Sequence, residues 1–446
     1  MSIHDQRGAP MSNGNAAATE GLEKAFALFQ GYFNDPLAEI DTALAADPGF
    51  FMGHAFRAGL FLISSEKAAV PELAASVAQM ERLAPRANER ERGHLAAARS
   101  WLDGDFHGAI RHYGETIANC PRDAIALQFA HQVDFLLGQS RMLRDRIAQI
   151  LPHWTRDEPT WGYLKGMHAF GLEEMGHYDE AWDAGSEALA INPRDAWAVH
   201  ACAHVCEMAG RTDQGIAFLE SRSDDWAPGN GFAFHNWWHL ALYHFERGDI
   251  ARVLELYDTA VHPEPTEVAM ALVDAAALLW RLHLAGHDVG NRWQAVADAY
   301  EPMVEDGYYA FNDMHAVMAF AATGREVSMR RVLATMERRA LDDDANAVIT
   351  RRVGLPICRA MAAFGRGDFA RTVELLEPVR LSAHQFGGSH AQRDILDWTL
   401  IEAALRSGQN GWARAFANER LARKPQSPLA LGFLARATQG KAALAA

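Results

Sequence analysis

The sequence predicts an all-α protein, a right-handed α-solenoid of about nine to eleven stacked helix pairs. Three observations predict this fold class. A glycine flanked by two apolar helical runs recurs between residues 104 and 408, at separations of 34 to 43 residues. Proline follows the second helical run in several of these repeats, where it cannot extend a helix. No segment shows the alternating Val, Ile and Thr pattern of a β-strand.

The N-terminal quarter of the chain lacks the recurring glycine. Residues 1–20, MSIHDQRGAPMSNGNAAATE, contain no apolar run, so we expect a flexible tail and no secretory signal. Residues 21–100 have the apolar pattern of one or two degenerate helix pairs. We therefore expect a single repeat domain over residues 21–435, whose last helix caps it, and an Ala-rich tail over residues 436–446.

The recurring glycine marks the turn between the two helices of each repeat. Glycine adopts positive φ without steric cost, so it can end a helix as its cap. A period of this length is typical of antiparallel helix pairs that stack into a solenoid. The glycines are Gly104, Gly138, Gly176, Gly210, Gly248, Gly286, Gly324, Gly367 and Gly408.

Composition limits the partners and the compartment. The chain has 446 residues, of which 49% are hydrophobic, and a net charge of −15. An acidic surface repels phosphate backbones, so nucleic acid is not an expected partner. No run of 18 apolar residues predicts a membrane span. Four cysteines form no disulfide framework, which favours a reducing, cytoplasmic location, and Cys202 and Cys206 are expected to fill the core. Oligomerisation is left open.

Histidines gather at equivalent positions of the repeats. On the first helix of each repeat, the inward-facing positions lie about ten, six and three residues before the glycine. Before Gly210 these positions hold His200, His204 and Glu207. Because successive repeats stack, such polar side chains should converge on one concave groove.

The segment FHNWWHLALYH places His235 and His239 one helical turn apart. The zinc-protease pattern HExxH requires a glutamate after the first histidine, and this segment has Asn236 instead. Packed core histidines, each bonded to a backbone carbonyl, are the structural alternative. No cofactor is predicted, although a transition metal such as zinc stays an alternative, with His200, His204 and Glu207 as its ligands.

Two later segments carry polar side chains at the start of predicted first helices. FNDMH contains Asn312, Asp313 and His315, and its structural alternative is an N-cap made by Asn312 or Asp313. GGSHAQRD could present backbone N–H groups and a hydroxyl at a helix N-terminus. Its structural alternative is an exposed, charged helix start.

The sequence resembles a known repeat pattern and a known protein family. Residues 161–193 resemble the tetratricopeptide pattern, through Trp161, Gly166, Ala169, Gly176, Tyr178, Ala181, Ala188 and Pro193. FHNWWHLALYHFERGD, FNDMHAVMAFAATG and GGSHAQRDILDWTLIEAALRSG resemble segments of the tetratricopeptide repeat protein thirty-eight family, over about residues 20–435. This resemblance implies a soluble helical-repeat protein and brings no settled activity.

Two functions fit these observations. The first is a groove that binds a small polar or anionic ligand and can act as an acid–base enzyme, a hydrolase, lyase or isomerase without a nucleotide cofactor. Its catalytic candidates are His200, His204, His235, His239, Asp313, His315, His390 and Asp394. Its ligand-binding candidates are Gln128, His131, Tyr163, Asn236, Trp238, Asn312, Ser389, Gln392 and Arg393. The second is a non-catalytic scaffold that binds a peptide or protein, the common role of tetratricopeptide arrays.

Overall fold

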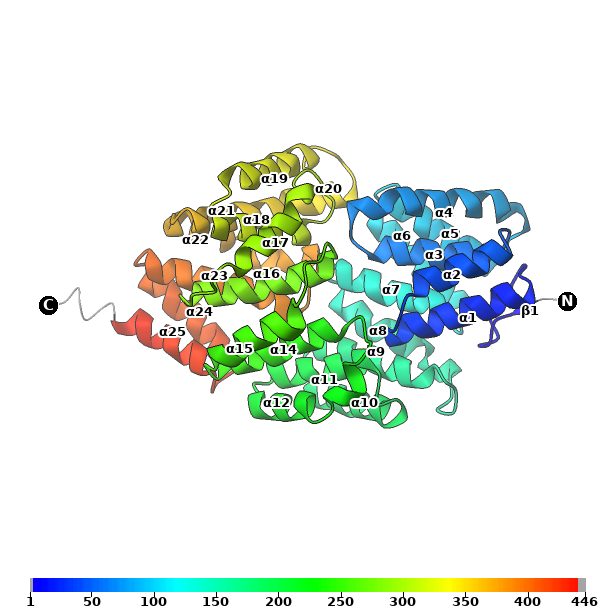
Figure 1. The fold of residues 1–446 in the computed structure, drawn as a ribbon, viewed down its shortest axis with the longest axis horizontal. Coiled ribbons are helices and arrows are strands. Elements are labelled where there is room, and N and C mark those ends of the chain that lie inside the picture. Colours follow the sequence, from blue (N-terminus) through cyan, green and yellow to red (C-terminus); the bar gives the residue numbers. More distant parts are fainter. Residues whose placement is uncertain (1–2, 440–446) are drawn as a thin grey trace. The chain divides into compact units, whose positions relative to one another are not determined.

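The computed structural model describes residues 3–439, and in this part of the chain it is almost entirely helical (Figure 1). The helices divide into two compact units. The first unit comprises Met1–Cys202 and Ser223–Ala233, and the second comprises Ala203–Arg222 and Phe234–Ala446. The expectation of a single repeat domain over residues 21–435 stays a prediction.

The first unit begins with a two-stranded hairpin and continues as helices. Its elements are β1 (Ile3–His4), β2 (Pro10–Met11), α1 (Ala16–Gly31), α2 (Pro36–Ala46), α3 (Phe51–Ile63), α4 (Val70–Leu83), α5 (Glu89–Leu102), α6 (Phe106–Asn119), α7 (Ala124–Leu136), α8 (Ser140–Ile150), α9 (Trp161–Glu174), α10 (Tyr178–Ile191), the first half of α11 (Ala196–Met208), and α13 (Ser223–Trp226).

The second unit begins within α11, at Ala203. Its further helices are α12 (Thr212–Glu220), α14 (Ala233–Glu246), α15 (Ile250–Leu256), α16 (Ala269–Leu284), α17 (Arg292–Tyr300), α18 (Ala310–Thr323), α19 (Glu326–Arg339), α20 (Ala345–Ile349), α21 (Leu355–Gly365), α22 (Phe369–Leu376), α23 (His390–Arg406), α24 (Asn410–Arg423) and α25 (Pro428–Gln439). Short 3₁₀ segments lie at Lys67–Ala69, Ala84–Arg86, Leu151–His153, Glu301–Met303 and Arg380–Phe386, and π-helical turns at Tyr257–Val261 and Thr350–Gly354.

Consecutive helices pack as pairs, as the sequence predicts. In the first unit α3 packs on α4, α5 on α6 and α9 on α10, and Figure 1 shows α3 to α6 side by side. In the second unit α21 packs on α22 and α24 on α25. The first helices α16, α18, α21 and α23 also contact one another, so they form an inner layer. The all-α fold of stacked helix pairs is confirmed.

The recurring glycines end the first helix of each repeat. All nine have φ between +63° and +83°, as the sequence predicts. Gly248 shows how the turn works. Its N–H donates to the carbonyl of Phe245, and the N–H of Asp249 donates to that of His244, so two carbonyls at the end of α14 are paired. The Asp249 side chain then accepts the N–H of Arg252 and caps α15.

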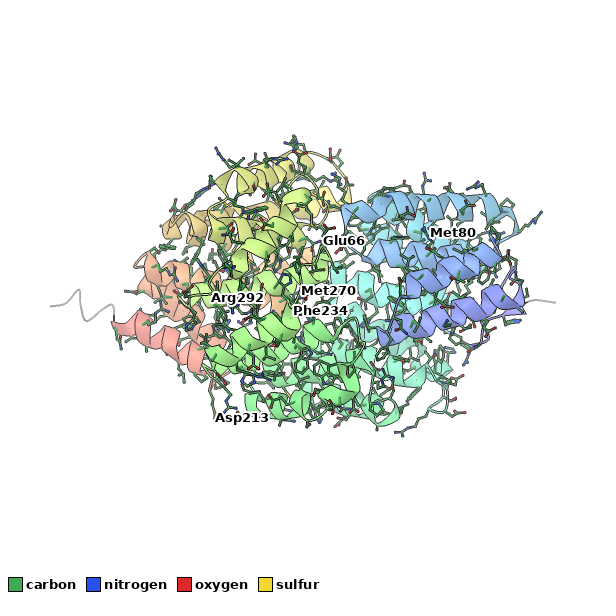
Figure 2. The ribbon with its side chains drawn as sticks, in the orientation of Figure 1. Glu66, Met80, Asp213, Phe234, Met270 and Arg292 are labelled. Carbon is green, nitrogen blue, oxygen red and sulfur yellow. The ribbon has the colours of Figure 1, made fainter. Side chains whose placement is uncertain are left out.

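Side chains fill the space between the paired helices (Figure 2). Met80 of α4 is buried in the packing of the first unit, whereas Asp213 at the start of α12 points outward. The interior of the first unit contains a cluster of rings from Phe26, Phe29 and Phe56 with edge-to-face geometry. Such burial supplies the main stabilising free energy of the helix pairs.

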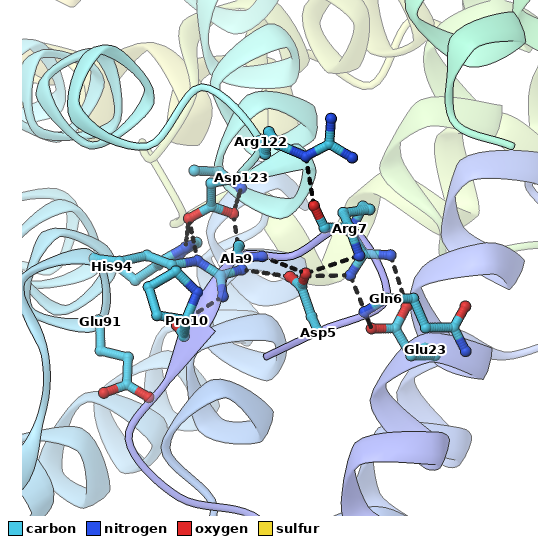
Figure 3. Close-up of polar contacts among 12 residues, drawn as sticks. Asp5, Gln6, Arg7, Ala9, Pro10, Glu23, Glu91, His94, Arg122 and Asp123 are labelled. Atoms are coloured by element: carbon cyan, nitrogen blue, oxygen red, sulfur yellow. Dashed lines mark hydrogen bonds and ion pairs between the residues drawn. The ribbon is translucent and has the colours of Figure 1, made fainter. Parts of the chain in front are cut away.

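The structure corrects the expectation of a flexible tail up to residue 20. Residues 3–11 form the β1–β2 hairpin, and α1 begins at Ala16 with Asn15 as its N-cap. Asp5 and Arg7 are buried. Arg7 donates to Glu23 of α1 at 2.6 Å, which ties the hairpin to the first helix (Figure 3).

A buried network of charges joins this hairpin to α5. Arg90 donates to Asp123 at 2.7 Å and to Asp5 of the hairpin at 3.1 Å (Figure 3). His94 lies 2.9 Å from the same carboxylate of Asp123. These neighbours hold the pKa of Asp123 well below its usual range, because the nearby positive charges overcome the effect of burial. The hairpin is therefore a part of the first unit.

The insertion Ser221–Phe232 also returns to the N-terminal helix. Asn230 donates its side-chain amide to the carbonyl of Gly31 at 2.8 Å, and Gly231 donates its N–H to the carbonyl of Tyr32 at 2.7 Å. This insertion thus covers the end of α1 within the first unit. At the C-terminal end the last helix is α25, which extends to Gln439, and residues 440–446 of the predicted tail lie outside the described residues. None of the helices in residues 3–439 is both long and apolar enough to cross a membrane.

Candidate functional site

The second unit contains a cavity of about 290 Å³. Part of its wall comes from the inward-facing positions of the repeats. Glu207 lies three residues before Gly210, Leu242 and Phe245 lie six and three before Gly248, and Trp398 lies ten before Gly408. Glu207 is the one acidic side chain among these four, so the convergence of polar side chains on one groove stays a prediction. The cavity is lined by Glu207, Ala209, Gly210, Thr212, Leu242, Tyr243, Phe245, Glu246, Arg281, Asp394, Trp398, Arg420, Lys424, Pro425, Gln426, Ser427 and Pro428.

Arg281 on α16 is the most deeply buried charge of the cavity wall, 2% exposed. It donates to the carbonyls of Ala277 and Ala391, at 3.0 and 2.7 Å. Its guanidinium carbon lies 5.2 Å from the ring centroid of Trp238, within the range of cation–π attraction. Burial lowers the pKa of Arg281, although the carboxylates of Asp394 and Glu207 act in the opposite direction.

The other charges at the cavity differ in how they are compensated. Arg420 of α24 pairs with Asp394 of α23, with Nη2 2.9 Å from Oδ2. This pairing holds the pKa of Asp394 below its usual range. Glu246 accepts a hydrogen bond from the hydroxyl of Ser427. Lys424 also lines the cavity, and its ammonium group has no carboxylate within ion-pair distance among the described residues.

Three buried histidines of the second unit lie close together beside the cavity. They are His204 on α11 and, one helical turn apart on α14, His235 and His239. One ring nitrogen of each lies within 4.8 Å of those of the other two. The ring centroids of His204 and His239 are 4.5 Å apart, and those of His235 and His239 are 5.0 Å apart.

Two carboxylates orient these rings. Nδ1 of His239 lies 3.0 Å from Oε2 of Glu207, and Nδ1 of His235 lies 2.6 Å from Oδ2 of Asp274 on α16. Glu207 thus contacts His239 and also lines the cavity. Burial, together with the neighbouring His204 and His235, lowers the pKa of His239 well below its usual range. A neutral imidazole with Nδ1–H directed at a carboxylate can act as a base or as a metal ligand through Nε2.

The remaining residues of the FHNWWH segment are packed on the same helix. Trp238 is fully buried, and its ring stacks on His235 at 5.3 Å between centroids. Asn236 is also fully buried. Neither side chain lines the cavity, so their predicted contact with a ligand has no geometric support in this unit.

The predicted site residues of the first unit lie in its aromatic interior. His200 packs against Trp197, Phe170 and Phe232, with ring centroids 4.8 to 5.2 Å apart. His131 packs between Phe170 and Trp197, and burial lowers its pKa to about 3. These histidines fit the alternative of packed core rings.

Two further predicted ligand-binding residues also belong to the first unit. Gln128 is buried on α7. The Tyr163 hydroxyl accepts a hydrogen bond from Asn192 at 3.3 Å, and burial raises the pKa of Tyr163 to about 12. Both side chains are accounted for by the packing of their own unit.

The segment at residues 310–315 is built into α18. The helix begins at Ala310, with Tyr309 as the N-cap residue, so neither Asn312 nor Asp313 is the N-cap. This corrects the capping alternative, because the helix starts earlier than the segment suggests. Asp313 is buried, and Nδ1 of His315 lies 2.8 Å from the carbonyl of Phe311, the contact expected of a structural histidine. Burial lowers the pKa of His315 to about 4.

The segment at residues 387–394 forms the start of α23. Ser389 and Gln392 make a capping box, in which each side chain accepts the backbone N–H of the other. Arg393 donates to the carbonyls of Gly387 and Gly388, which precede the helix. His390 is the first residue of the helix. Three of the five predicted residues here, Ser389, Gln392 and Arg393, therefore hold the helix start, and Asp394 alone of the five lines the cavity.

Sequence reasoning missed the cationic side of the cavity, which Arg281, Arg420 and Lys424 form. One signal for Arg281 was present. Asp274 and Arg281 are the acidic and basic residues of the otherwise apolar helix AMALVDAAALLWRLHL, and they lie seven residues apart on one face. The sequence contains no comparable signal for Lys424, which follows an ordinary polar helix.

No family model matches the chain. Similar solved structures include a human IFIT1 dimer with m7Gppp-AAAA, at 11% identity over 96% of both chains and a TM-score of 0.45. They also include the Cut9–Hcn1 hetero-tetramer of the APC/C, at 12% identity over 94% of this chain and 76% of that one and a TM-score of 0.42. Yeast Tom70 is similar at 12% identity over 96% of both chains, with a TM-score of 0.33.

The helix pairs and their glycine turns define the class of protein. The chain is an all-α helical-repeat protein. Within it, the second unit combines a cavity lined with cations and a buried cluster of three histidines.

Proposed function

We propose that the second unit binds a small organic anion in the cavity lined by Arg281 and Lys424. The observation that carries this proposal is that these two cations face the cavity without a carboxylate partner among the described residues. Arg281 is buried and Lys424 is half-buried, and a buried charge is costly unless it is paired or binds an opposite charge. An anionic ligand would supply that charge.

The carboxylates of the cavity support the same assignment, because they are already engaged. Asp394 pairs with Arg420, Glu207 contacts His239, and Glu246 accepts from Ser427. Arg281 and Lys424 are therefore the two cations of the cavity wall that can still meet an anionic ligand. This assigns anion binding to Arg281 and Lys424 rather than to Arg393, a ligand-binding candidate from the sequence whose side chain donates to Gly387 and Gly388.

Size and wall chemistry limit the ligand further. A cavity of about 290 Å³ holds a small molecule. Leu242, Phe245 and Trp398 provide apolar and flat surfaces. We therefore propose a ligand with one anionic group and a planar apolar part, such as an aromatic or unsaturated carboxylate.

Two finer assignments belong to this proposal. The resemblance of the FHNWWH and GGSHAQRD segments favours membership of the tetratricopeptide repeat protein thirty-eight family. We also assign to His239, whose partner Glu207 lines the cavity, an acid–base role toward the bound ligand. An assay for chemical change of the bound ligand tests this role. The alternative of a peptide- or protein-binding scaffold is compatible with the helical-repeat fold.

A matched pair of probes tests the proposal. Benzoate and benzamide have the same ring and nearly the same shape, but only benzoate carries a negative charge. Binding to the full chain is measured by ligand-detected NMR and by the shift of Tm. We expect benzoate to bind and benzamide to bind at least ~10-fold more weakly, since a charge-assisted hydrogen bond contributes ~1.5–3 kcal/mol.

The variants Lys424→Met and Arg281→Met should each abolish the preference for benzoate. Arg414→Met is the control, because Arg414 lies on α24, the helix that Lys424 follows directly, and does not line the cavity. Equal binding of both probes, or a preference that persists in both cavity variants, would overturn the proposal. A peptide with a free C-terminal carboxylate, tested in the same way, distinguishes the scaffold alternative, because only a peptide would then bind.

A further inference from the structure

The cluster of His204, His235 and His239 is a second feature of this unit that anion binding does not use. All three rings are buried, with His204 and His239 fully shielded from solvent. Core histidines are ordinarily spread among apolar or backbone neighbours, as His315 is with the carbonyl of Phe311. Here three imidazoles instead lie against one another, with a nitrogen of each within 4.8 Å of the others.

The carboxylates around the cluster have the arrangement of an outer ligand shell. Asp274 contacts Nδ1 of His235 at 2.6 Å, and Glu207 contacts Nδ1 of His239 at 3.0 Å. When Nδ1–H donates to a carboxylate, the ring carries its lone pair on Nε2 and its basicity rises. Both contacts therefore prepare the histidines of α14 to bind a cation through Nε2.

The charges of the cluster also favour a divalent cation. The carboxylates of Glu207 and Asp274 lie against two of the three imidazoles, at 3.0 and 2.6 Å. One divalent metal ion would balance them.

We propose that His204, His235 and His239 bind one divalent transition metal ion, for which zinc is the best match, with Glu207 and Asp274 as positioning residues. Three histidines and one further position form the ligand set of catalytic zinc sites. Tetrahedral zinc with Zn–N bonds of ~2.0–2.1 Å brings its nitrogens to about 3.4 Å, so the rings close in by rotation from the separations of up to 4.8 Å. This site differs from the sequence prediction of His200, His204 and Glu207, because Glu207 lies behind His239.

The proposed metal site lies beside the cavity. Glu207 lines the cavity on one side and contacts His239 on the other. A metal ion bound by His239 would therefore lie one side chain away from the cavity wall. The proposal does not depend on the anion site, since Lys424 and Arg281 are not among the proposed ligands.

Cobalt(II) is the probe for the test, because four-coordinate cobalt has strong visible absorption and replaces zinc at such sites. The full chain, without a histidine tag, is treated with a chelator and titrated with cobalt, and zinc is then added as a competitor. We expect one equivalent of cobalt to give the four-coordinate spectrum and zinc to displace it. His239→Gln and His204→Gln should abolish the spectrum, and the exposed His287→Gln should leave it unchanged.

The outer carboxylates keep the test decisive if a histidine variant fails to fold. Glu207→Gln and Asp274→Asn preserve side-chain volume, and we expect each to weaken cobalt binding by about 10–100-fold with the native circular dichroism retained. Lys424→Met should lose the response to benzoate and still bind cobalt, which separates this proposal from the anion site. Absence of the four-coordinate spectrum from the folded wild-type chain, or a spectrum that survives in all the folded cluster variants, would overturn the metal site.

Discussion

Arg90 and Asp123 form a buried ion pair in the first unit, with Nε 2.7 Å from Oδ2, and Nη2 of the same arginine reaches Asp5 at 3.1 Å. One guanidinium thus joins the start of α7 to a hairpin that precedes it by more than a hundred residues. Both carboxylates are shielded from solvent, so this arginine compensates two buried negative charges.

Replacing Arg90 by Met should destabilise the first unit by about 3–5 kcal/mol, because the buried Asp5 is left with Arg7 and the buried Asp123 with His94 as the remaining ion-pair partner. Urea unfolding followed by circular dichroism measures the loss. Hydrogen exchange should also rise at residues 3–11. Arg99→Met is the matched control, since Arg99 pairs with Glu81 and Asp103 on the surface and its loss should cost at most ~1 kcal/mol. Equal losses in both variants would show that the hairpin is not held by this network.

Asp195 should make the stability of the fold decrease as the pH rises, whereas a paired carboxylate makes it increase. It is fully buried and accepts the N–H groups of Trp197 and Ala198, and burial raises its pKa to about 7. In the unfolded chain an aspartate has a pKa of about 3.9. Because the folded pKa is the higher, this group stabilises the fold most below about pH 4, and that contribution is lost as the pH rises through 7.

Asp195→Asn removes this titration while its side-chain oxygen can still accept both N–H groups. We expect the Tm of the variant to rise relative to that of the wild type between pH 4 and 7. Above pH 7 the difference between the two Tm values should stay constant. Thermal unfolding across this pH range is the measurement. A difference in Tm that is constant with pH would contradict the raised pKa.

The helix pairs could be predicted because their signals are local. A glycine with positive φ and an aspartate that caps the next helix lie within a few residues of each other, as Gly248 and Asp249 do. The N-terminal hairpin could not be predicted, because Asp5 and Arg7 look like a polar tail until Arg90 and Glu23 are placed beside them. Composition alone does not reveal a charge whose partner is distant in the sequence.

The candidate site was predicted in part for the same reason. Helical periodicity was enough to bring Glu207, Leu242 and Phe245 to one surface. It could not show that Ser389 and Arg393 are used by their own helix start, since a capping box and an anion site need the same residue types. Which of these roles a residue takes depends on neighbours brought by the tertiary fold.

The recurring glycines give a second test of the fold. Gly248 has φ of +77°, and an added Cβ would meet no atom within 4 Å. Gly248→Ala should therefore cost about 1–2 kcal/mol through backbone strain alone. Gly432 in the exposed face of α25 also has open space around an added Cβ, but it has ordinary helical φ. Gly432→Ala should stabilise the chain by roughly 0.5–1 kcal/mol in urea unfolding. Destabilisation of similar size in both variants would contradict the role of positive φ.

Arg281 should behave unlike the other buried arginines when it is replaced. Arg146 pairs with the buried Asp134 at 2.5 Å, so Arg146→Met should cost about 3–5 kcal/mol. Arg281 has backbone carbonyls as its partners, and its burial already lowers its pKa, so its charge is held at a cost to the fold.

Without added ligand, Arg281→Met should therefore leave the free energy of unfolding unchanged or raise it by up to about 2 kcal/mol, since an apolar side chain of similar volume replaces a buried cation. Urea unfolding of the two variants side by side makes the comparison. With benzoate present the wild type should be more stable than Arg281→Met, because the wild type gains stability from the bound anion and the variant does not. A loss as large as that of Arg146→Met would instead make Arg281 a structural residue, kept for the carbonyls of Ala277 and Ala391.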